Sequence, residues 1–348
     1  MTKIFFMQKQ GLVIKLGSTI ITNNKGDIDE AVIQKLAKEV ASLTTRYNVV
    51  LVSSGAVASG KAFLRNFKGT LTEKKAAAAV GNPLLIQLYH RYFSQYGITI
   101  AQALCERHHF STRSQFLQLK DTFLEFWTNN IIPVVNENDM VSNVELKFSD
   151  NDELATLIAI GLDAETLLIC TSAGGFLNAE KKVIPVVDKI DHEIVSFVHA
   201  GKSSIGLGGM LSKLTFTRLA TSLGIRVIIS GLRGELPLSE ALEGTKGTIF
   251  KARKSDLKAR QKWLASGSIT IGSIYVDEGA EKALGTRKSL LAVGVSKVKG
   301  KFLHGEVVQL VNLKESIIGV AKVRLSAEEL KEPKKGAIAA HADDIVLF

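Results

Sequence analysis

The chain has 348 residues, of which 46% are hydrophobic and 22% are charged, a composition that argues against disorder and leaves room for two globular domains. No apolar window approaches the roughly 18 uninterrupted residues of a membrane helix, and the N-terminus has no apolar stretch of signal-peptide length. The two cysteines, Cys105 and Cys170, lie far apart in apolar surroundings, which disfavours a disulfide framework and favours a reducing compartment. We therefore expect a cytoplasmic protein that is not attached to a membrane.

The positive charge of the chain is concentrated in one segment. Basic residues outnumber acidic ones by 44 to 34, and residues 251–262 (KARKSDLKARQK) hold six basic residues against one acidic. Such a run predicts a solvated, partly helical linker, with contact to a polyanion as the alternative. The location of the excess matters more than its size when nucleic-acid binding is considered.

Apolar runs and helical periodicity predict an α/β fold in the first 250 residues. Five short runs rich in β-branched residues predict buried strands at 11–16, 48–53, 131–135, 166–171 and 226–230. Helix-length amphipathic segments separate them, most clearly at 29–47, where Val32, Leu36, Val40 and Leu43 recur at spacings of three and four. Uniformly apolar strands that alternate with helices predict a mainly parallel sheet covered by helices on both faces.

The pattern changes after residue 267. Short alternating runs punctuated by glycine predict a small, mostly β domain, most simply a compact barrel. We therefore expect an α/β domain at 1–252, a basic linker at 253–267 and a β domain at 268–348.

Ligands of an open α/β sheet bind beyond the carboxyl ends of its strands, so the residues after each run are candidates for a site. The segment GAVASGKA (55–62) follows a strand and nearly matches the phosphate loop G-x-x-x-x-G-K-[ST]. Ala62 stands where that loop needs a hydroxyl for magnesium. We expect a glycine-rich turn that opens a helix and can hold an anion, rather than a true phosphate loop.

Two lysines are also candidates. Lys15 lies inside the apolar run 11–16, where its ammonium group must either reach the surface or meet an anion. Residues 203–214 (SSIGLGGMLSKL) place three glycines and Lys213 ahead of the helical segment TFTRLATSL. This arrangement predicts either a phosphate-binding loop or a flexible surface loop.

Residues 136–152 (NENDMVSNVELKFSDND) carry acid and amide side chains at both ends. The segment lacks the spacing of an EF-hand, which leaves a turn-rich surface loop or the wall of an active site. Its position after the apolar run 131–135 favours the wall, where carboxylates would bind lysines or hydrated magnesium. We expect residues 140–149 to form a loop or hairpin that lets both ends face one pocket.

These motifs, taken in chain order, resemble those of the glutamate 5-kinase family within the amino acid kinase superfamily. The kinase motifs are VIKLGST, VSSGAVASG, AAAAVGN, IIPVVNENDMV, FSDNDELATLIA, GLGGMLSKL and GTIF, and ITIGSIYVDEGAEKAL with SLLAVGVSKVKGKFLHGEVV resembles the family's C-terminal PUA-type domain. The resemblance implies the amino acid kinase fold followed by a PUA-type barrel. It also implies transfer of a phosphoryl group from ATP, with Mg²⁺, to the side-chain carboxylate of L-glutamate, the first step of proline biosynthesis.

The resemblance also implies roles for individual residues. Lys15 would contact the ATP phosphates, Lys213 would stabilise charge on the transferred group, and Asp152 would orient both lysines. Glutamate would be held by Ser54, Asp139 and Asn151. The nucleotide-binding positions are Thr171, Ser172, Leu207, Gly208, Gly209, Met210, Leu211, Ser212 and Lys213. Ser172 stands where the family commonly has Asp, and Leu207 where it has Thr, and these departures concern contacts with the base or ribose more than with the phosphates.

Further expectations follow from the same resemblance. They are inhibition by proline in competition with glutamate, and a homo-oligomer, either a dimer or a tetramer. One alternative is a sibling kinase acting on aspartate, acetylglutamate, carbamate or a nucleoside monophosphate, against which the acid and amide segment and the PUA-type domain argue. Another is an RNA-binding protein acting through residues 268–348. Residues 263–348 hold only 12 basic residues against 10 acidic, which weakens that alternative.

Overall fold

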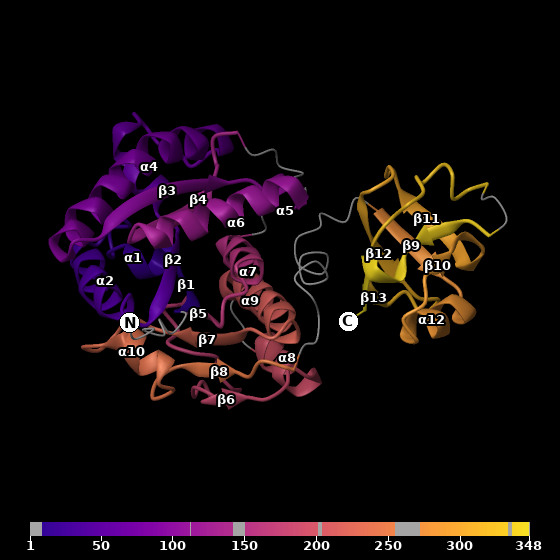
Figure 1. The fold of residues 1–348 in the computed structure, drawn as a ribbon. Helices are drawn as coiled ribbons and strands as arrows, with labels where there is room; N and C mark the ends of the chain where they lie inside the picture. The colour runs from indigo at the N-terminus through magenta and orange to yellow at the C-terminus, as the bar shows by residue number, and fades with distance from the viewer. Residues whose placement is uncertain are drawn as a thin grey trace, which may run out of the picture. The chain divides into compact units, whose positions relative to one another are not determined.

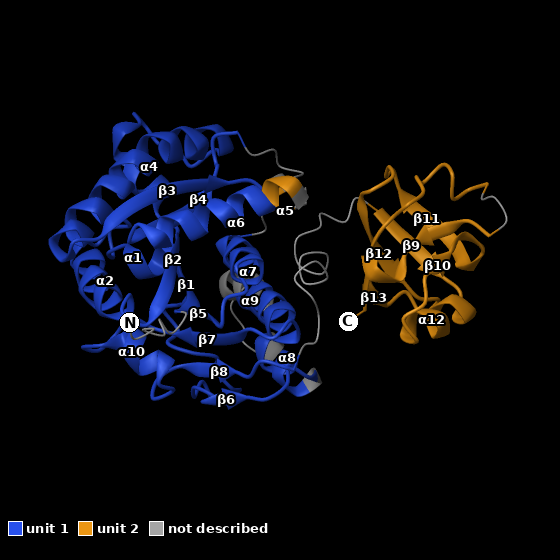
Figure 2. Ribbon diagram, in the orientation of Figure 1, with its two compact units in different colours: residues 1–106, 117–254 blue, residues 107–116, 255–348 orange. Residues whose placement is uncertain are grey.

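The computed structural model describes residues 9–111, 113–141, 150–200, 204–254, 272–332 and 336–347. The chain divides into two compact units, one of residues 1–106 and 117–254 and the other of residues 107–116 and 255–348 (Figure 2). Most of the predicted linker at 253–267 and of the predicted loop at 140–149 lies outside the described residues. No described helix has the length and apolar content needed to cross a bilayer.

The first unit is built on an eight-stranded sheet (Figure 1). In spatial order its strands are β3 (Thr99–Cys105), β4 (Ile131–Glu137), β2 (Tyr47–Ser53), β1 (Gln10–Leu16), β5 (Thr166–Cys170), β7 (Arg226–Ser230), β8 (Thr248–Phe250) and β6 (Val186–Val187). All neighbours pair in parallel except β7 and β8. The predicted mainly parallel sheet is therefore confirmed, and its strands β4, β2, β1, β5 and β7 end at one common carboxyl edge.

Helices cover both faces of this sheet, as predicted. The helices of the unit are α1 (Ser18–Ile21), α2 (Glu30–Leu43), α3 (Ala56–Gly60), α4 (Leu71–Phe93), most of α6 (Arg113–Thr128), α7 (Asn151–Gly161), α8 (His192–Ala200), α9 (Ser204–Ser222) and α10 (Pro237–Leu242). Helix α5 (His108–Ser111) and the start of α6 fall in residues 107–116, which group with the second unit. Helices α2, α4 and α10 pack on one another or on the sheet, and α7 packs on β1, β2, β4 and β5. Helix α9 lies against α7 and β7.

Alternation along the strands assigns side chains to the two faces. Leu12, Ile14 and Leu16 of β1 belong to one buried core together with side chains of α2, α4 and α10. Lys15 lies between Ile14 and Leu16 and therefore projects to the opposite face, where α7 packs. Strand β1 is central in the sheet, so both of its faces are buried from Leu12 to Leu16, and that stretch is apolar apart from this lysine.

Helices α3 and α4 touch backbone to backbone. A Cβ atom at Gly60 would overlap the carbonyl oxygen of Ala77, and one at Gly81 would overlap the carbonyl oxygen of Ala56. Lys61, the lysine of the near phosphate-loop motif, pairs with Asp27 at 3.3 Å and donates to the carbonyl oxygen of Gly26 at 2.7 Å. The glycine and lysine of this motif are therefore used to pack helices and to hold a loop, as expected for a segment that is not a true phosphate loop.

Sequence patterns found the central strands and missed the peripheral ones. All five predicted strands are present as β1, β2, β4, β5 and β7. Strand β3 escaped prediction because it is an edge strand with only partial burial, and β6 and β8 because they are only two and three residues long. The prediction that 203–214 forms a loop was wrong, because helix α9 begins at Ser204 and Lys213 lies well inside it. Packing against α7 and β7 offsets the intrinsic cost of the glycines, about 1 kcal/mol each.

The second unit is mostly β, as predicted. Five of its strands form one sheet in the order β11 (Val295–Gly300), β9 (Gly272–Val276), β12 (Val307–Val311), β13 (Ile317–Lys322) and β15 (Ile345–Leu347). Strands β10 (Leu290–Leu291) and β14 (Ile338–Ala340) pair separately, and helix α12 (Glu278–Gly285) is capped by Asp277. Alternating apolar residues of β9, β12 and β13 build its own core around Ile274, Val308 and Ala321.

Candidate active site at the carboxyl edge of the sheet

Lys15 and Lys213 meet at the carboxylate of Asp152. The Nζ atom of Lys15 lies 2.7 Å from Oδ1 of Asp152, and the Nζ atom of Lys213 lies 2.8 Å from Oδ2. Asp152 has no exposed surface and Lys15 is only 6% exposed. Lys15 therefore meets an anion instead of reaching the surface. The cluster thus places two ammonium groups around one carboxylate at a largely dry position.

Asp150 holds the helices that carry this cluster. Its Oδ1 accepts hydrogen bonds from the backbone nitrogens of Asp152 and Glu153, at 2.9 and 3.2 Å, and so caps the N-terminus of α7. Its Oδ2 accepts a hydrogen bond of 2.7 Å from the hydroxyl of Ser212, which precedes Lys213 on α9. One side chain thus starts α7 and fastens α9 beside it, which brings Lys213 to Asp152.

A chain of neutral side chains lies next to the charged cluster. The amide nitrogen of Asn151 donates to the hydroxyl oxygen of Ser54 at 3.1 Å and to the amide oxygen of Asn136 at 3.0 Å. The amide nitrogen of Asn136 donates in turn to the amide oxygen of Asn82 at 3.3 Å. These four residues come from α7, the end of β2, β4 and α4, so the chain crosses the carboxyl edge of the sheet from one face to the other.

The backbone of Gly17 lies close to the ammonium group of Lys15. A Cβ atom at Gly17 would lie 3.7 Å from Nζ of Lys15 and 3.5 Å from the carbonyl oxygen of Cys170, so any side chain there would stand against the ammonium group. Burial raises the pKa of the Cys170 thiol to about 12, and Cys105 is affected in the same way. Both thiols are free and buried.

The predicted site residues are distributed as follows. Lys15, Lys213 and Asp152 form the charged cluster, and Asn151 and Ser54 belong to the neutral chain. Asp139 is half-buried in the turn after β4, three residues beyond Asn136. Thr171 and Ser172 follow β5 at the same edge, and the backbone nitrogen of Thr171 donates to the carbonyl oxygen of Ser230 at 2.7 Å.

The remaining predicted nucleotide-binding positions lie on α9. The backbone of Leu207, Gly208, Gly209, Met210 and Leu211 is helical, and the surroundings of all of these except Met210 lie outside what the structure describes. Met210 and Ser212 are half-buried.

Sequence reasoning gave no role to Asp150, Asn136 or Asn82. Asp150 had a local signal, because an aspartate just before an apolar helical run is a typical N-cap. Asn136 follows a strand at the edge where ligands bind, which is a weaker signal. Asn82 has none, since an asparagine in the middle of a 23-residue helix is chosen by its tertiary contact.

A resident metal ion does not fit the residues of this site. Both oxygens of Asp152 face lysines, and no group of three or more His, Cys, Asp or Glu side chains suited to a metal occurs among the described residues.

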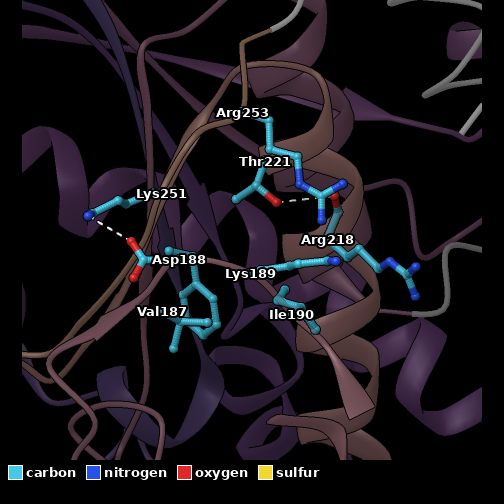
Figure 3. A pocket seen from close by; sticks show the side chains of 9 residues that line it. Val187, Asp188, Lys189, Ile190, Arg218, Thr221, Lys251 and Arg253 are labelled. Atoms are coloured by element: carbon cyan, nitrogen blue, oxygen red, sulfur yellow. Dashed lines mark hydrogen bonds and ion pairs between the residues drawn. The ribbon is translucent and has the colours of Figure 1, made fainter. Parts of the chain in front are cut away.

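A separate cationic depression lies elsewhere in the first unit (Figure 3). It is lined by Val187, Asp188, Lys189, Ile190, Arg218, Thr221, Phe250, Lys251 and Arg253. Because β8 runs antiparallel to β7, with Phe250 beside Val227, the residues after β8 lie at the amino edge of β7. The depression is therefore at the opposite edge of the sheet from Lys15 and Asp152, and it is not part of the candidate site.

The fold and the lysine cluster define the class of protein. A mainly parallel sheet with two lysines gathered at its carboxyl edge is suited to holding phosphate groups. The model of the amino acid kinase family matches residues 10–231, and the model of the PUA domain matches residues 272–345.

Named relatives narrow the class. Glutamate 5-kinase from Aquifex aeolicus (strain VF5) is 40% identical over 93% of this chain and 92% of its own length. Glutamate 5-kinase from Haemophilus influenzae (strain 86-028NP) is 34% identical over 98% and 100%, and glutamate 5-kinase 1 from Bacillus subtilis (strain 168) is 36% identical over 94% and 93%. The chain belongs to the glutamate 5-kinase family.

Proposed function

We propose that this protein transfers the γ-phosphoryl group of ATP to the side-chain carboxylate of L-glutamate, giving L-glutamyl 5-phosphate and ADP. The observation that carries this proposal is the Lys15–Asp152–Lys213 cluster beside Asn151 and Ser54, at the carboxyl edge of the sheet. Family membership over both units supports an enzyme of this kind over a sibling kinase or an RNA-binding protein.

The chemistry needs charge neutralisation more than it needs a base. The glutamate side chain, with an ordinary pKa of about 4.3, is already ionised at neutral pH, so its oxygen attacks the γ-phosphorus directly. The bond from that phosphorus to the bridging oxygen breaks, and ADP leaves with the electron pair. The barrier comes from bringing two anions together, which positively charged donors lower by stabilising the phosphoryl oxygens.

Lys15 and Lys213 are the donors we assign to this task. An ammonium group has three hydrogens, and the only described partner of Lys15 is one oxygen of Asp152. Lys15 thus retains donors for ATP phosphates while Asp152 holds its position. Lys213 reaches the same carboxylate from α9, and we assign it the transferred group. Thr171, Ser172 and residues 207–213 would complete the nucleotide site.

Magnesium enters, in this proposal, as part of the Mg-ATP substrate. Mg²⁺ commonly binds through substrate phosphates and water with few protein ligands, which suits a site whose central carboxylate is committed to lysines.

We assign the glutamate site to Ser54, Asp139 and Asn151. These residues follow β2, follow β4 and begin α7, and the contact between Asn151 and Ser54 brings two of the three together. A carboxylate such as Asp139 suits the ammonium group of an amino acid.

The decisive experiment offers the purified protein Mg-ATP and one acceptor at a time. The acceptors are glutamate, aspartate, N-acetylglutamate, carbamate and UMP, and the readouts are ADP release and trapping of the acyl phosphate by hydroxylamine. We expect turnover and a hydroxamate with glutamate. Turnover with another acceptor and none with glutamate would contradict the assignment.

Four further proposals accompany this function: the domain limits, the cellular location, the assembly and inhibition by proline. The domain limits are 1–252, 253–267 and 268–348, and the protein acts in the cytoplasm as a homo-oligomer, a dimer or a tetramer. Free, buried Cys105 and Cys170 support a reducing compartment. Proline, which carries the same α-carboxylate and a positively charged nitrogen, competes with glutamate, so a proline titration should raise the apparent KM for glutamate. Light scattering tests the assembly.

A further inference from the structure

The neutral side chains at the site form an ordered chain in which each amide has a direction. Asn136 donates from its nitrogen to Asn82 and accepts at its oxygen from Asn151. The amide nitrogen of Asn151 therefore donates to both Asn136 and Ser54. An amide nitrogen has two hydrogens, so both are used.

The direction of these hydrogen bonds determines which groups Asn151 and Ser54 can offer to a ligand. Among the described residues, none hydrogen bonds to the amide oxygen of Asn151, and none accepts the hydroxyl hydrogen of Ser54. Asn151 thus presents an acceptor and Ser54 presents a donor. An acceptor suits an ammonium group and a donor suits a carboxylate, which are the two charged groups on the α-carbon of an amino acid.

We propose that Asn82, two hydrogen bonds away from Asn151, is a positioning residue that sets this direction and so makes the site select acceptors with an α-ammonium group. This inference rests on the proposed glutamate kinase function. If the acceptor oxygen of Asn82 is lost, the Asn136 amide is free to turn its nitrogen toward Asn151. Asn151 then turns its oxygen inward and its nitrogen outward, where it opposes an ammonium group.

Asn82 is well held for this role. It is 9% exposed, and its neighbour Gly81 packs against the carbonyl oxygen of Ala56 without room for a Cβ atom. The contact between α3 and α4 therefore fixes the turn of α4 that carries the amide. Asn136 is 7% exposed, so little water is available to replace a lost partner.

The test measures kcat, the KM for glutamate, the KM for ATP and the inhibition constant of glutarate, which is glutamate without its ammonium group. For Asn82→Leu, which keeps the branched shape and removes the acceptor, we expect the KM for glutamate to rise about tenfold, with kcat and the KM for ATP within about twofold. The inhibition constant of glutarate should rise clearly less than the KM for glutamate, because glutarate has no ammonium group to lose and shares only the carboxylate contact with Ser54. Asn82→Asp keeps an acceptor oxygen and should restore the KM to within about threefold of the parent value.

A matched control separates direction from general damage. Tyr89→Phe removes another buried hydrogen bond of the same helix, the 2.7 Å contact between the Tyr89 hydroxyl and Ser53. This contact is not part of the hydrogen-bonded row of Asn82, Asn136, Asn151 and Ser54. It should lower Tm and leave the KM for glutamate unchanged. Should Asn82→Leu fail to fold, Asn82→Ala carries the same expectation with less steric demand.

The outcomes are distinguishable. An active parent enzyme with an unchanged KM for glutamate in Asn82→Leu overturns the role of Asn82 and leaves the proposed function intact. Equal weakening of glutamate and glutarate, or the same KM change in Tyr89→Phe, also overturns it, because either result indicates a general distortion. A parent protein that turns over another acceptor and not glutamate overturns both proposals.

Discussion

Two polar clusters share the first turn of α7 and differ in almost every physical respect. Asp152 joins two lysines in a charged cluster, whereas Asn151, its immediate neighbour, joins Asn136, Asn82 and Ser54 in a neutral one. Successive residues of a helix point about 100° apart, so one turn serves both. Under the proposed function, charge is concentrated where phosphate is held, whereas uncharged groups with a fixed hydrogen-bond direction lie where the acceptor amino acid is selected.

The largest expected effect is the loss of kcat when Lys15 is removed from the charged cluster. Lys15→Met keeps the side-chain volume and removes the ammonium group, and we expect kcat to fall about 10²–10³-fold, as when a transition-state donor is lost. Tm should change little, since Asp152 keeps Lys213. The measurement is ADP release at saturating substrates, with Tm from calorimetry.

Lys61→Met is the matched control for this prediction. Lys61 belongs to the near phosphate-loop motif but pairs with Asp27, so its loss should leave kcat unchanged. Parallel losses of Tm and kcat in Lys15→Met would assign Lys15 to structure instead. A large loss of kcat in Lys61→Met would restore the phosphate loop as a candidate.

Removing Asn151 should break the neutral cluster with a smaller and different effect. For Asn151→Ala we expect the KM for glutamate to rise about 10–100-fold, because a half-buried polar recognition group is lost, while the KM for ATP stays within about twofold. Steady-state kinetics with each substrate varied in turn test this. A change confined to the KM for ATP would indicate that Asn151 belongs to the nucleotide site, together with the charged cluster.

A change in helix packing should sharpen the comparison. Gly81→Ala places a Cβ atom against the carbonyl oxygen of Ala56, and overpacking of this kind costs about 1–3 kcal/mol of unfolding free energy. Because α4 carries Asn82 and α7 carries Asp152, we expect the KM for glutamate to shift more than the KM for ATP. Gly285→Ala, where a Cβ atom would meet nothing within 4 Å, is the control and should leave both stability and kinetics unchanged.

The smallest expected effect is on stability and concerns the buried carboxyl of Glu39. Unlike Asp152, which pairs with two lysines, this carboxyl accepts a hydrogen bond from the backbone. Glu39 is 3% exposed and accepts a hydrogen bond from the backbone nitrogen of Ser239 at 2.8 Å. Burial raises the pKa of its carboxyl above the ordinary value of 4.5 more than this hydrogen bond lowers it. The folded state therefore binds the proton more tightly than the unfolded chain, and ionisation costs stability as the pH rises above 4.5.

Glu39→Gln should remove that cost and keep an acceptor for Ser239. We expect its Tm to exceed that of the parent by roughly 1–3 °C at pH 8, with the difference shrinking as the pH falls toward about 4. Calorimetry at several pH values checks the trend. A variant that is less stable than the parent at pH 8 would mean that the charge at Glu39 is stabilising.

The sequence predicted much of this arrangement where the signal was local. Runs of β-branched residues identified the five central strands, and the lysine inside one of them was a marker of either exposure or an anion. Resemblance to a family, more than spacing, divided Asn151 from Asp152 by role. The glycines of 203–214 misled the local prediction, because packing against α7 and β7 outweighs their poor helix propensity.

By itself the sequence determined which segments form the central strands, which edge carries polar residues and where the fold changes from α/β to β, because periodicity and turn residues act over short distances. The tertiary structure alone decided that Lys15 meets Asp152, that Lys61 holds a loop and that Asn136 donates to Asn82. Ser54 and Asn151 are 97 positions apart and Asn82 and Asn136 are 54 apart. Such contacts depend on the order in which strands β4, β2, β1 and β5 assemble, and no local pattern encodes that order.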